Sequence, residues 1–203
     1  MTHLQAFQQK LREKAEAALI TSSQNQFYLS HFPFEDGFLL IFGDAAYLLT
    51  DFRYFEAASR ACADGFEVLS PATGAFSEIG TQMELHGATT LLVEENDLTL
   101  AMHARLAAQF PALKTVTGAS AILKALREYK DAAELAAIAA AQQITDAAFT
   151  HILDFLCKER TEREVALELE TFMRKNGSDG VAFPTIAVSG TAPCAGKKTF
   201  GNS

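Results

Sequence analysis

The residues best suited to chemistry stand between a predicted strand and a predicted helix, where the chain runs Asp51-Phe52-Arg53-Tyr54. An arginine guanidinium binds both oxygens of a carboxylate, so Arg53 or Tyr54 could face a pocket for a substrate that carries a carboxylate. The same residues also suit a structural role. Asp51 could cap a helix that starts near Arg53, while Arg53 pairs with a carboxylate in the domain core or in a dimer interface. Both interpretations stay open.

His31 is the histidine that merits testing first, because it begins an aromatic loop, residues 31–34, that precedes Glu35-Asp36-Gly37. A loop of this kind either packs on the sheet as surface structure or carries a binding residue. The remaining histidines have no partners at metal-ligand spacing, which argues against a mononuclear zinc site; they are His3, His86, His103 and His151.

Three acidic residues, Glu94, Glu95 and Asp97, cluster after a predicted strand. Paired carboxylates can serve general acid and base catalysis. A solvated strand end with one charge at a helix N-terminus explains the same pattern, and we favour that interpretation. The sequence contains none of the motifs GxSxG, HExxH, GxGxxG or a P-loop, so no catalytic residue is assigned.

Composition excludes several classes of protein. The formal net charge is −8 and Lys and Arg form no dense run, which argues against binding to nucleic acid. The N-terminus is polar rather than a signal peptide, and no apolar run approaches the ~20 residues that span a bilayer. Three widely spaced cysteines without a CxxC motif suit reduced thiols. We therefore expect a cytoplasmic protein with no membrane contact.

Strands and helices alternate through residues 17–117, which predicts an α/β fold. Two apolar runs, residues 38–42 and 45–50, are separated by Gly43-Asp44 and predict a hairpin. One hairpin combined with crossover units gives a mixed sheet flanked by helices. We expect this domain to occupy residues 1–120.

The pattern changes after residue 120. Helical spacing continues through residues 121–129 and 131–157, and Thr161 with Glu164 forms a capping box that opens a third helix ending near Asn176-Gly177. The sequence of residues 183–188 predicts a strand. We expect residues 121–203 to form a second, incomplete domain of two main helices and one strand.

Three stretches, taken in order, resemble the creatinase/prolidase/aminopeptidase P family of proline-specific metallopeptidases. The first contains an opening strand followed by an Asn-x-x-Tyr-Leu-Ser segment, and the second is a Leu-Thr-Asp-x-Arg-Tyr element. The third enters the family's catalytic domain. In this chain they are residues 18–30, residues 48–54, and residues 126–130, 146–149, 161–166 and 183–190.

The resemblance implies a creatinase-like N-terminal domain followed by part of a pita-bread (α+β) domain. It implies hydrolysis of the peptide bond before proline by two divalent metal ions, manganese, cobalt or zinc, held by two aspartates, one histidine and two glutamates. All five ligands would follow the Ser-Gly that matches Ser189-Gly190. The tail from Thr191 to Ser203 contains no Asp, Glu or His, and Cys194 stands where the family usually has histidine.

No metal ligand can therefore be assigned, and no cofactor is expected in this chain. We expect a truncated family member that is inactive alone and forms a homodimer, while the full-length family acts on Xaa-Pro peptides. The resemblance also implies that the loop beginning at His31 can approach the active site of its own or a neighbouring subunit. The candidate substrate-binding residues are therefore His31, Arg53 and Tyr54. The alternative is a non-enzymatic creatinase-like module for dimerisation or peptide binding. Only fold analogy supports a different α/β hydrolase.

Overall fold

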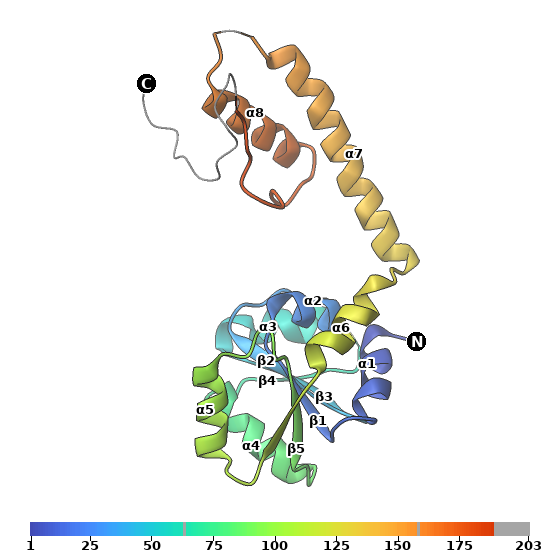
Figure 1. Ribbon diagram of the computed structural model, residues 1–203, viewed down its shortest axis with the longest axis vertical. Coiled ribbons are helices and arrows are strands. Elements are labelled where there is room, and N and C mark those ends of the chain that lie inside the picture. The colour runs from blue at the N-terminus through green and yellow to red at the C-terminus, as the bar shows by residue number, and fades with distance from the viewer. Residues whose placement is uncertain (63, 158, 189–203) are drawn as a thin grey trace. The chain divides into compact units, whose positions relative to one another are not determined.

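The computed structural model describes residues 1–62, 64–157 and 159–188 (Figure 1). The chain divides into two compact units, Met1–Tyr129 and Lys130–Ser203. The boundary expected from the sequence lies at residue 120. The observed division comes later because α6, Ala119–Glu128, buries Ala119 and Leu123 in the core of the first unit. Ser189-Gly190, Cys194 and the rest of the tail lie outside the described residues.

The first unit is built on a six-stranded sheet in the order β4-β3-β2-β1-β5-β6. The first three strands form an antiparallel meander, and β4, β5 and β6 join it in parallel. This arrangement confirms the predicted mixed sheet with one hairpin. The strands are β1 Ala17–Ile20, β2 Gly37–Phe42, β3 Ala46–Thr50, β4 Glu67–Leu69, β5 Thr90–Val93 and β6 Lys114–Thr117.

Strand β1 is central and fully buried, with all four residues at 0% exposure. Successive side chains of a strand point to opposite faces, so β1 contributes to both cores. Ala18 and Ile20 belong to one hydrophobic cluster, and Ala17 and Leu19 belong to the other. A continuous apolar run is the sequence signature of such a strand.

Helices cover both faces of the sheet, giving three layers (Figure 1). The first hydrophobic cluster contains side chains from α1, α2, α3 and α6, whereas α4 and α5 contribute to the second. Burial on two faces is what the alternating strands and helices predict. The helices not yet bounded are α1 His3–Leu11, α2 Ser23–Ser30, α3 Phe52–Ala61, α4 Ala75–Leu85 and α5 Leu100–Gln109.

Glu16 fixes the start of β1 against the start of β5. Its Oε2 accepts hydrogen bonds from the backbone N–H groups of Thr89 at 2.7 Å and Thr90 at 2.9 Å, and from both threonine hydroxyls. The backbone N–H of Glu16 donates in turn to Thr90 Oγ1 at 3.0 Å. These bonds, led by the backbone bond from Thr89, lower the pKa of Glu16 to about 2. The parallel register of the two strands is therefore held by a carboxylate that stays ionised near neutral pH.

The second unit contains α7, Ala132–Phe155, and α8, Glu162–Lys175. Thr161 and Glu164 form the predicted capping box at the start of α8. The two helices are joined by His151, whose Nε2 lies 2.7 Å from Glu168 Oε1 and whose ring stacks on Phe172. Among the helices of the described residues, none combines the length and apolar character needed to cross a membrane.

Residues 183–188, predicted as a strand, adopt no regular structure. A strand requires a neighbour to satisfy its backbone groups, and the described part of the second unit contains no other strand. The segment is instead attached to α8 by a side-chain hydrogen bond, in which Thr185 Oγ1 donates to Glu170 Oε1 at 2.7 Å. Phe183 and Ile186 remain largely exposed, at 70% and 73%.

Candidate functional site

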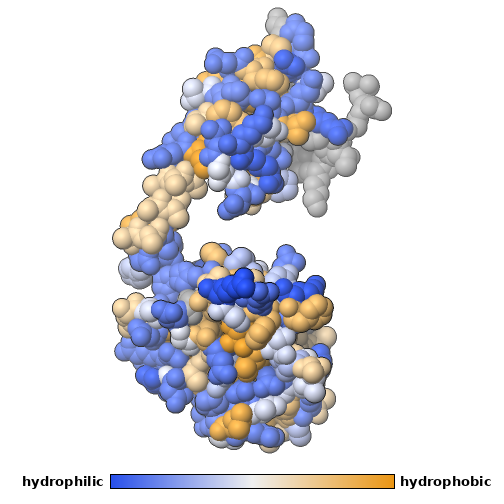
Figure 2. Space-filling model, turned by 180° about the vertical axis from the view of Figure 1, so that it is seen from behind, coloured by the Kyte–Doolittle hydropathy of each residue, from blue (hydrophilic) through white to orange (hydrophobic). Residues whose placement is uncertain are grey.

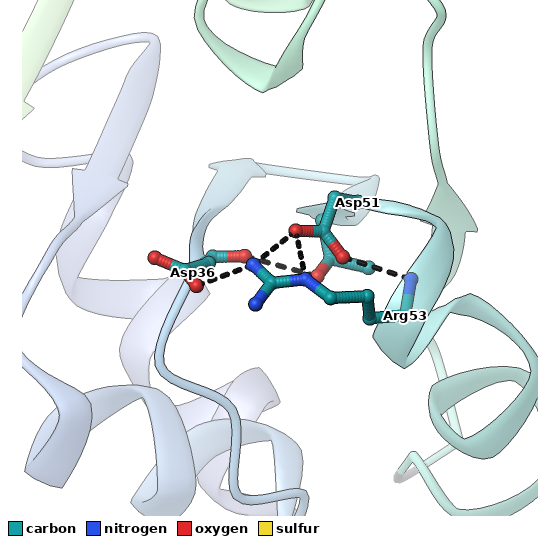
Figure 3. Close-up of polar contacts among 4 residues, drawn as sticks. Asp36, Asp51 and Arg53 are labelled. Carbon is teal, nitrogen blue, oxygen red and sulfur yellow. Dashed lines mark hydrogen bonds and ion pairs between the residues drawn. The ribbon is translucent and has the colours of Figure 1, made fainter.

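Arg53 lies between two carboxylates at the end of β3 (Figure 3). Its Nε donates to Asp51 Oδ2 at 2.8 Å, and its Nη2 lies 2.5 Å from both Asp51 Oδ2 and Asp36 Oδ2. Asp51 also caps α3, because its Oδ1 accepts the backbone N–H of Arg53 at 2.8 Å. This confirms the capping role predicted for Asp51, and the partners of Arg53 are solvent-accessible carboxylates rather than core ones.

The two carboxylates keep the guanidinium charged. The hydrogen bonds that Arg53 donates to Asp51 and Asp36 raise the pKa of Arg53, and the hydrogen bond that Asp51 accepts from Arg53 lowers the pKa of Asp51. The described contacts occupy Nε and Nη2 of Arg53, and Figure 3 shows the Nη1 nitrogen directed away from both aspartates. The arginine can therefore offer Nη1 to a further acceptor while it stays fixed.

The other two predicted binding residues lie in different environments. Tyr54 is half-buried and packs against the first hydrophobic cluster, with Arg53 Cζ 5.6 Å from its ring centroid. His31 is exposed, ends α2 with a φ of 54°, and stacks on His3 with ring centroids 5.4 Å apart. The loop that begins at His31 reaches Arg53 through Asp36.

Glu94 lies in an environment that the sequence did not indicate. The expectation of a solvated strand end is wrong for this residue, which is only 1% exposed. Its Oε2 accepts backbone N–H groups from Thr21 at 2.6 Å and Ser22 at 2.9 Å. Its Oε1 accepts hydrogen bonds from Ser22 Oγ at 2.7 Å and from Asn25 Nδ2 at 2.6 Å. The N-cap residue of α2, Ser22, makes no side-chain capping bond. The Glu94 carboxylate therefore acts as the hydrogen-bond acceptor for the backbone N–H groups at the start of this helix.

The neighbouring Glu95 behaves as predicted for a charge at a helix N-terminus. Its Oε2 accepts the backbone N–H of Gly118 at 2.8 Å and, more weakly, that of Ser120 at 3.4 Å, at the start of α6. Burial raises the pKa of Glu95, but the hydrogen bonds from backbone groups outweigh it and lower the pKa below its usual value. Asp97 accepts the Thr21 hydroxyl at 2.6 Å. Each of the three acidic residues therefore holds a loop or helix end, and acid–base catalysis gains no support.

The position of Glu94 follows from the pairing of strands rather than from a local pattern in the sequence. Strands β1 and β5 are parallel neighbours, with Leu19 opposite Val93. Their carboxyl ends therefore meet at one edge of the sheet, which brings Glu94 to the residues that follow β1. The information lies in the pairing of two strands far apart in the chain, and neither strand alone reveals it.

Family profiles match both units. The Creatinase/Prolidase N-terminal domain profile matches residues 3–129, which is more than half of the chain. The chain belongs to the creatinase/prolidase family. The profile of Metallopeptidase family M24 matches residues 136–197, so the creatinase-like unit is followed by a segment of the metallopeptidase domain.

Related sequences and solved structures agree with this assignment. An uncharacterized peptidase of Bacillus subtilis is 34% identical over 86% of this chain and 49% of its own length. An Xaa-Pro dipeptidase from Bacillus anthracis gives a TM-score of 0.81 at 31% identity, over 87% of this chain and 49% of that one. An X-Pro aminopeptidase from Thermotoga maritima gives a TM-score of 0.79 at 28% identity, and the match covers 87% of this chain and 51% of that one. The chain spans about half the length of the curated relatives it matches.

The acidic clusters of the creatinase-like unit do not fit the divalent metal ions of a metallopeptidase. Asp36 and Asp51 are directed at the Arg53 guanidinium, a cation that repels a second cation. The Glu94 carboxylate already accepts hydrogen bonds from Thr21, Ser22 and Asn25. Metal ligation would break these bonds, so neither cluster is suited to hold a catalytic metal ion.

Replacing Glu94 with glutamine should lower the free energy of unfolding of the first unit by about 1–3 kcal/mol. An amide can present only one acceptor oxygen, so its NH₂ group would face the Asn25 and Ser22 donors. Urea unfolding followed by tyrosine fluorescence measures this unit alone, because all four tyrosines lie in it and the chain has no tryptophan.

The matched control is Glu13→Gln, which removes an exposed carboxylate that lies 3.8 Å from Lys10. We expect the free energy of unfolding of this variant to stay within about 0.5 kcal/mol of that of the parent. Equal effects of the two substitutions would contradict a structural role for Glu94.

Proposed function

We propose that this chain works as part of a metal-dependent peptidase that cleaves the bond before proline. The observation that carries the proposal is the order of the two matches, a creatinase-like unit at residues 3–129 and then an M24 segment at residues 136–197. Relatives named Xaa-Pro dipeptidase share both regions with this chain over 87% to 88% of its length. We propose an Xaa-Pro peptide as the substrate class and the cytoplasm as the site of action.

We further propose that these 203 residues do not hydrolyse peptides by themselves. The relatives that share the fold are about twice as long, since the chain covers 49% of the Bacillus subtilis peptidase. The acidic clusters of the first unit are occupied by hydrogen-bond donors and by Arg53 rather than arranged around a cation. Metal-assisted hydrolysis needs a cation with an open coordination position that can activate water.

An assay of the 203-residue chain with an Xaa-Pro dipeptide and added Mn²⁺ or Co²⁺ should show no turnover above that of the buffer. The Bacillus anthracis Xaa-Pro dipeptidase serves as the positive control under the same conditions. Turnover that a chelator abolishes would overturn this part of the proposal and leave the family assignment intact.

We propose that Arg53, with Tyr54 and His31, contributes to binding the peptide. Three observations support this role. Arg53 is fixed by two aspartates yet its Nη1 has no partner in the described contacts, its guanidinium lies near Tyr54, and the loop from His31 is attached to it through Asp36. A fixed, charged guanidinium can add a hydrogen bond to a peptide carboxylate or carbonyl at little cost in side-chain entropy.

Titration of an Xaa-Pro dipeptide should shift the guanidinium NMR signals of Arg53, and Arg53→Lys should weaken binding roughly twofold to fivefold, the size of one exposed charge contact. Arg60→Lys is the matched control, because Arg60 lies on the same helix and pairs only with Glu56 in the described contacts. If the guanidinium NMR signals of Arg53 do not shift at saturating peptide concentration, Arg53 does not contact the peptide.

A second candidate function, self-association as a homodimer, is favoured by the exposed apolar residues of α7. Leu135, Ile138, Phe149 and Leu153 are each more than half exposed, at 57%, 53%, 64% and 53%. Figure 2 shows hydrophobic residues at the surface of this helix. Exposed apolar surface of this kind marks interaction sites, so we propose that a second copy of the chain covers it.

Light scattering over a range of concentrations should therefore report a dimer. The double substitution Phe149→Ser and Leu153→Ser should shift the equilibrium toward monomer, because it removes apolar area that association would bury. Asp154→Ser changes an exposed polar residue of the same helix and should leave the average mass measured by light scattering unchanged. A monomer at all concentrations for the parent chain would refute the dimer.

A further inference from the structure

The creatinase-like unit contains an open groove of about 600 Å³ between α1 and α6, two helices that lie side by side in Figure 1. Its apolar lining includes Ile122, Ala125 and Leu126 of α6 and the following Tyr129. Lys10 and Lys14 also line the groove. The volume lies within the range of small-molecule sites, which is about 300–1,000 Å³. All of these residues belong to the first unit, and none belongs to the Arg53 or Glu94 clusters.

Among the described residues that line the groove, the two lysines are the only charged ones. The chain as a whole carries a formal net charge of −8, so a lining with cations and no acid departs from its general character. Lys10 has a loose contact of 3.8 Å with Glu13, between side chains that are 53% and 61% exposed, which is worth little. No partner for the Lys14 ammonium appears among the described contacts. Both ammonium groups can therefore bind an anion.

The start of α6 contributes no further anion site, although Gly118 also lines the groove. Its backbone N–H donates to Glu95 at 2.8 Å, as the backbone N–H of Ser120 does at 3.4 Å. The positive end of the helix is thus already neutralised by a protein carboxylate. Recognition of a ligand charge depends on the two lysine side chains alone.

We propose that this groove binds small amphiphilic carboxylates, of which medium-chain fatty acids are the simplest. The apolar body of the ligand lies along Ile122, Ala125 and Leu126, where burial drives binding. The carboxylate lies between Lys10 and Lys14, whose long flexible stems let both ammonium groups reach it. A multiply charged ligand such as a nucleotide does not fit, because most of the lining is apolar.

Isothermal titration of the full 203-residue chain with decanoate, below its micelle concentration, tests the proposal. Decanoate should bind saturably with one site per chain, and decyltrimethylammonium, which has the same tail and the opposite charge, should not bind. The double variant Lys10→Gln and Lys14→Gln should weaken decanoate binding about fivefold to tenfold, as two exposed charge contacts imply. Ala125→Trp, which fills the groove along its apolar lining from an exposed position, should abolish binding.

Lys124→Gln is the matched control, since Lys124 is an exposed lysine of α6 outside the groove. Its decanoate affinity should equal that of the parent, and circular dichroism should show that every variant keeps its helices. The proposal is overturned if decanoate does not saturate, if decanol binds as tightly as decanoate, or if Lys124→Gln weakens binding as much as the double variant. Adsorption to phosphatidylglycerol vesicles without a saturable decanoate site would indicate a membrane surface instead and would also overturn it.

Discussion

The complete burial of β1 is the constraint on which the first unit depends. Four apolar residues form the centre of the sheet, pair with strands on both sides and contribute to both hydrophobic clusters. A strand in this position tolerates no polar side chain without a partner. The polar groups that hold its two ends are therefore placed just beyond the strand, where Glu16 precedes it and Thr21 follows it.

Those strand ends are organised by carboxylates whose hydrogen bonds are satisfied within the protein. Glu16 fixes the start of β1 against β5, and Glu94 fixes its end against the start of α2. Arg127 extends the second network, because its Nη1 donates to Asn25 Oδ1 at 3.1 Å from the last turn of α6. Glu94 is buried, and a buried ionic group is stable only when such bonds compensate for lost hydration. Arg53 differs from both glutamates, since its Nη1 is directed away from the two aspartates with which it pairs.

Local patterns in the sequence were enough to predict most of the first unit and the start of α8 in the second. The continuous apolar run of β1, the turn at Gly43-Asp44 and the capping residues Asp51 and Thr161 each depend on neighbours in the chain, and each prediction is confirmed. Features that depend on partners distant in the chain could not be predicted from local patterns. The strand expected at residues 183–188 lacks a described partner, and α6 joins the first unit through packing that its own periodicity does not reveal.

The candidate site shows the same division. The sequence identified Arg53 and the cap that holds its backbone, but Asp36, which reaches the guanidinium from the loop before β2, was not foreseen. Glu94 was expected in solvent because a strand end is usually exposed, and its burial follows from the pairing of β1 with β5. Contacts across the sheet, rather than residue type, decide which polar side chains are structural and which stay accessible.

The strand order also bears on how the chain folds during synthesis. The antiparallel part of the sheet, from β1 to β3, is complete once residue 50 has been made, and its pairings join segments close in sequence. The parallel partner of β1 is β5, and the contact of Glu16 with Thr90 spans 74 positions. Local pairings form faster than distant ones because less loop entropy is lost. The nascent chain can therefore assemble a three-stranded nucleus with one edge of β1 open, and that edge remains a surface for chaperones or for mispairing until β5 emerges.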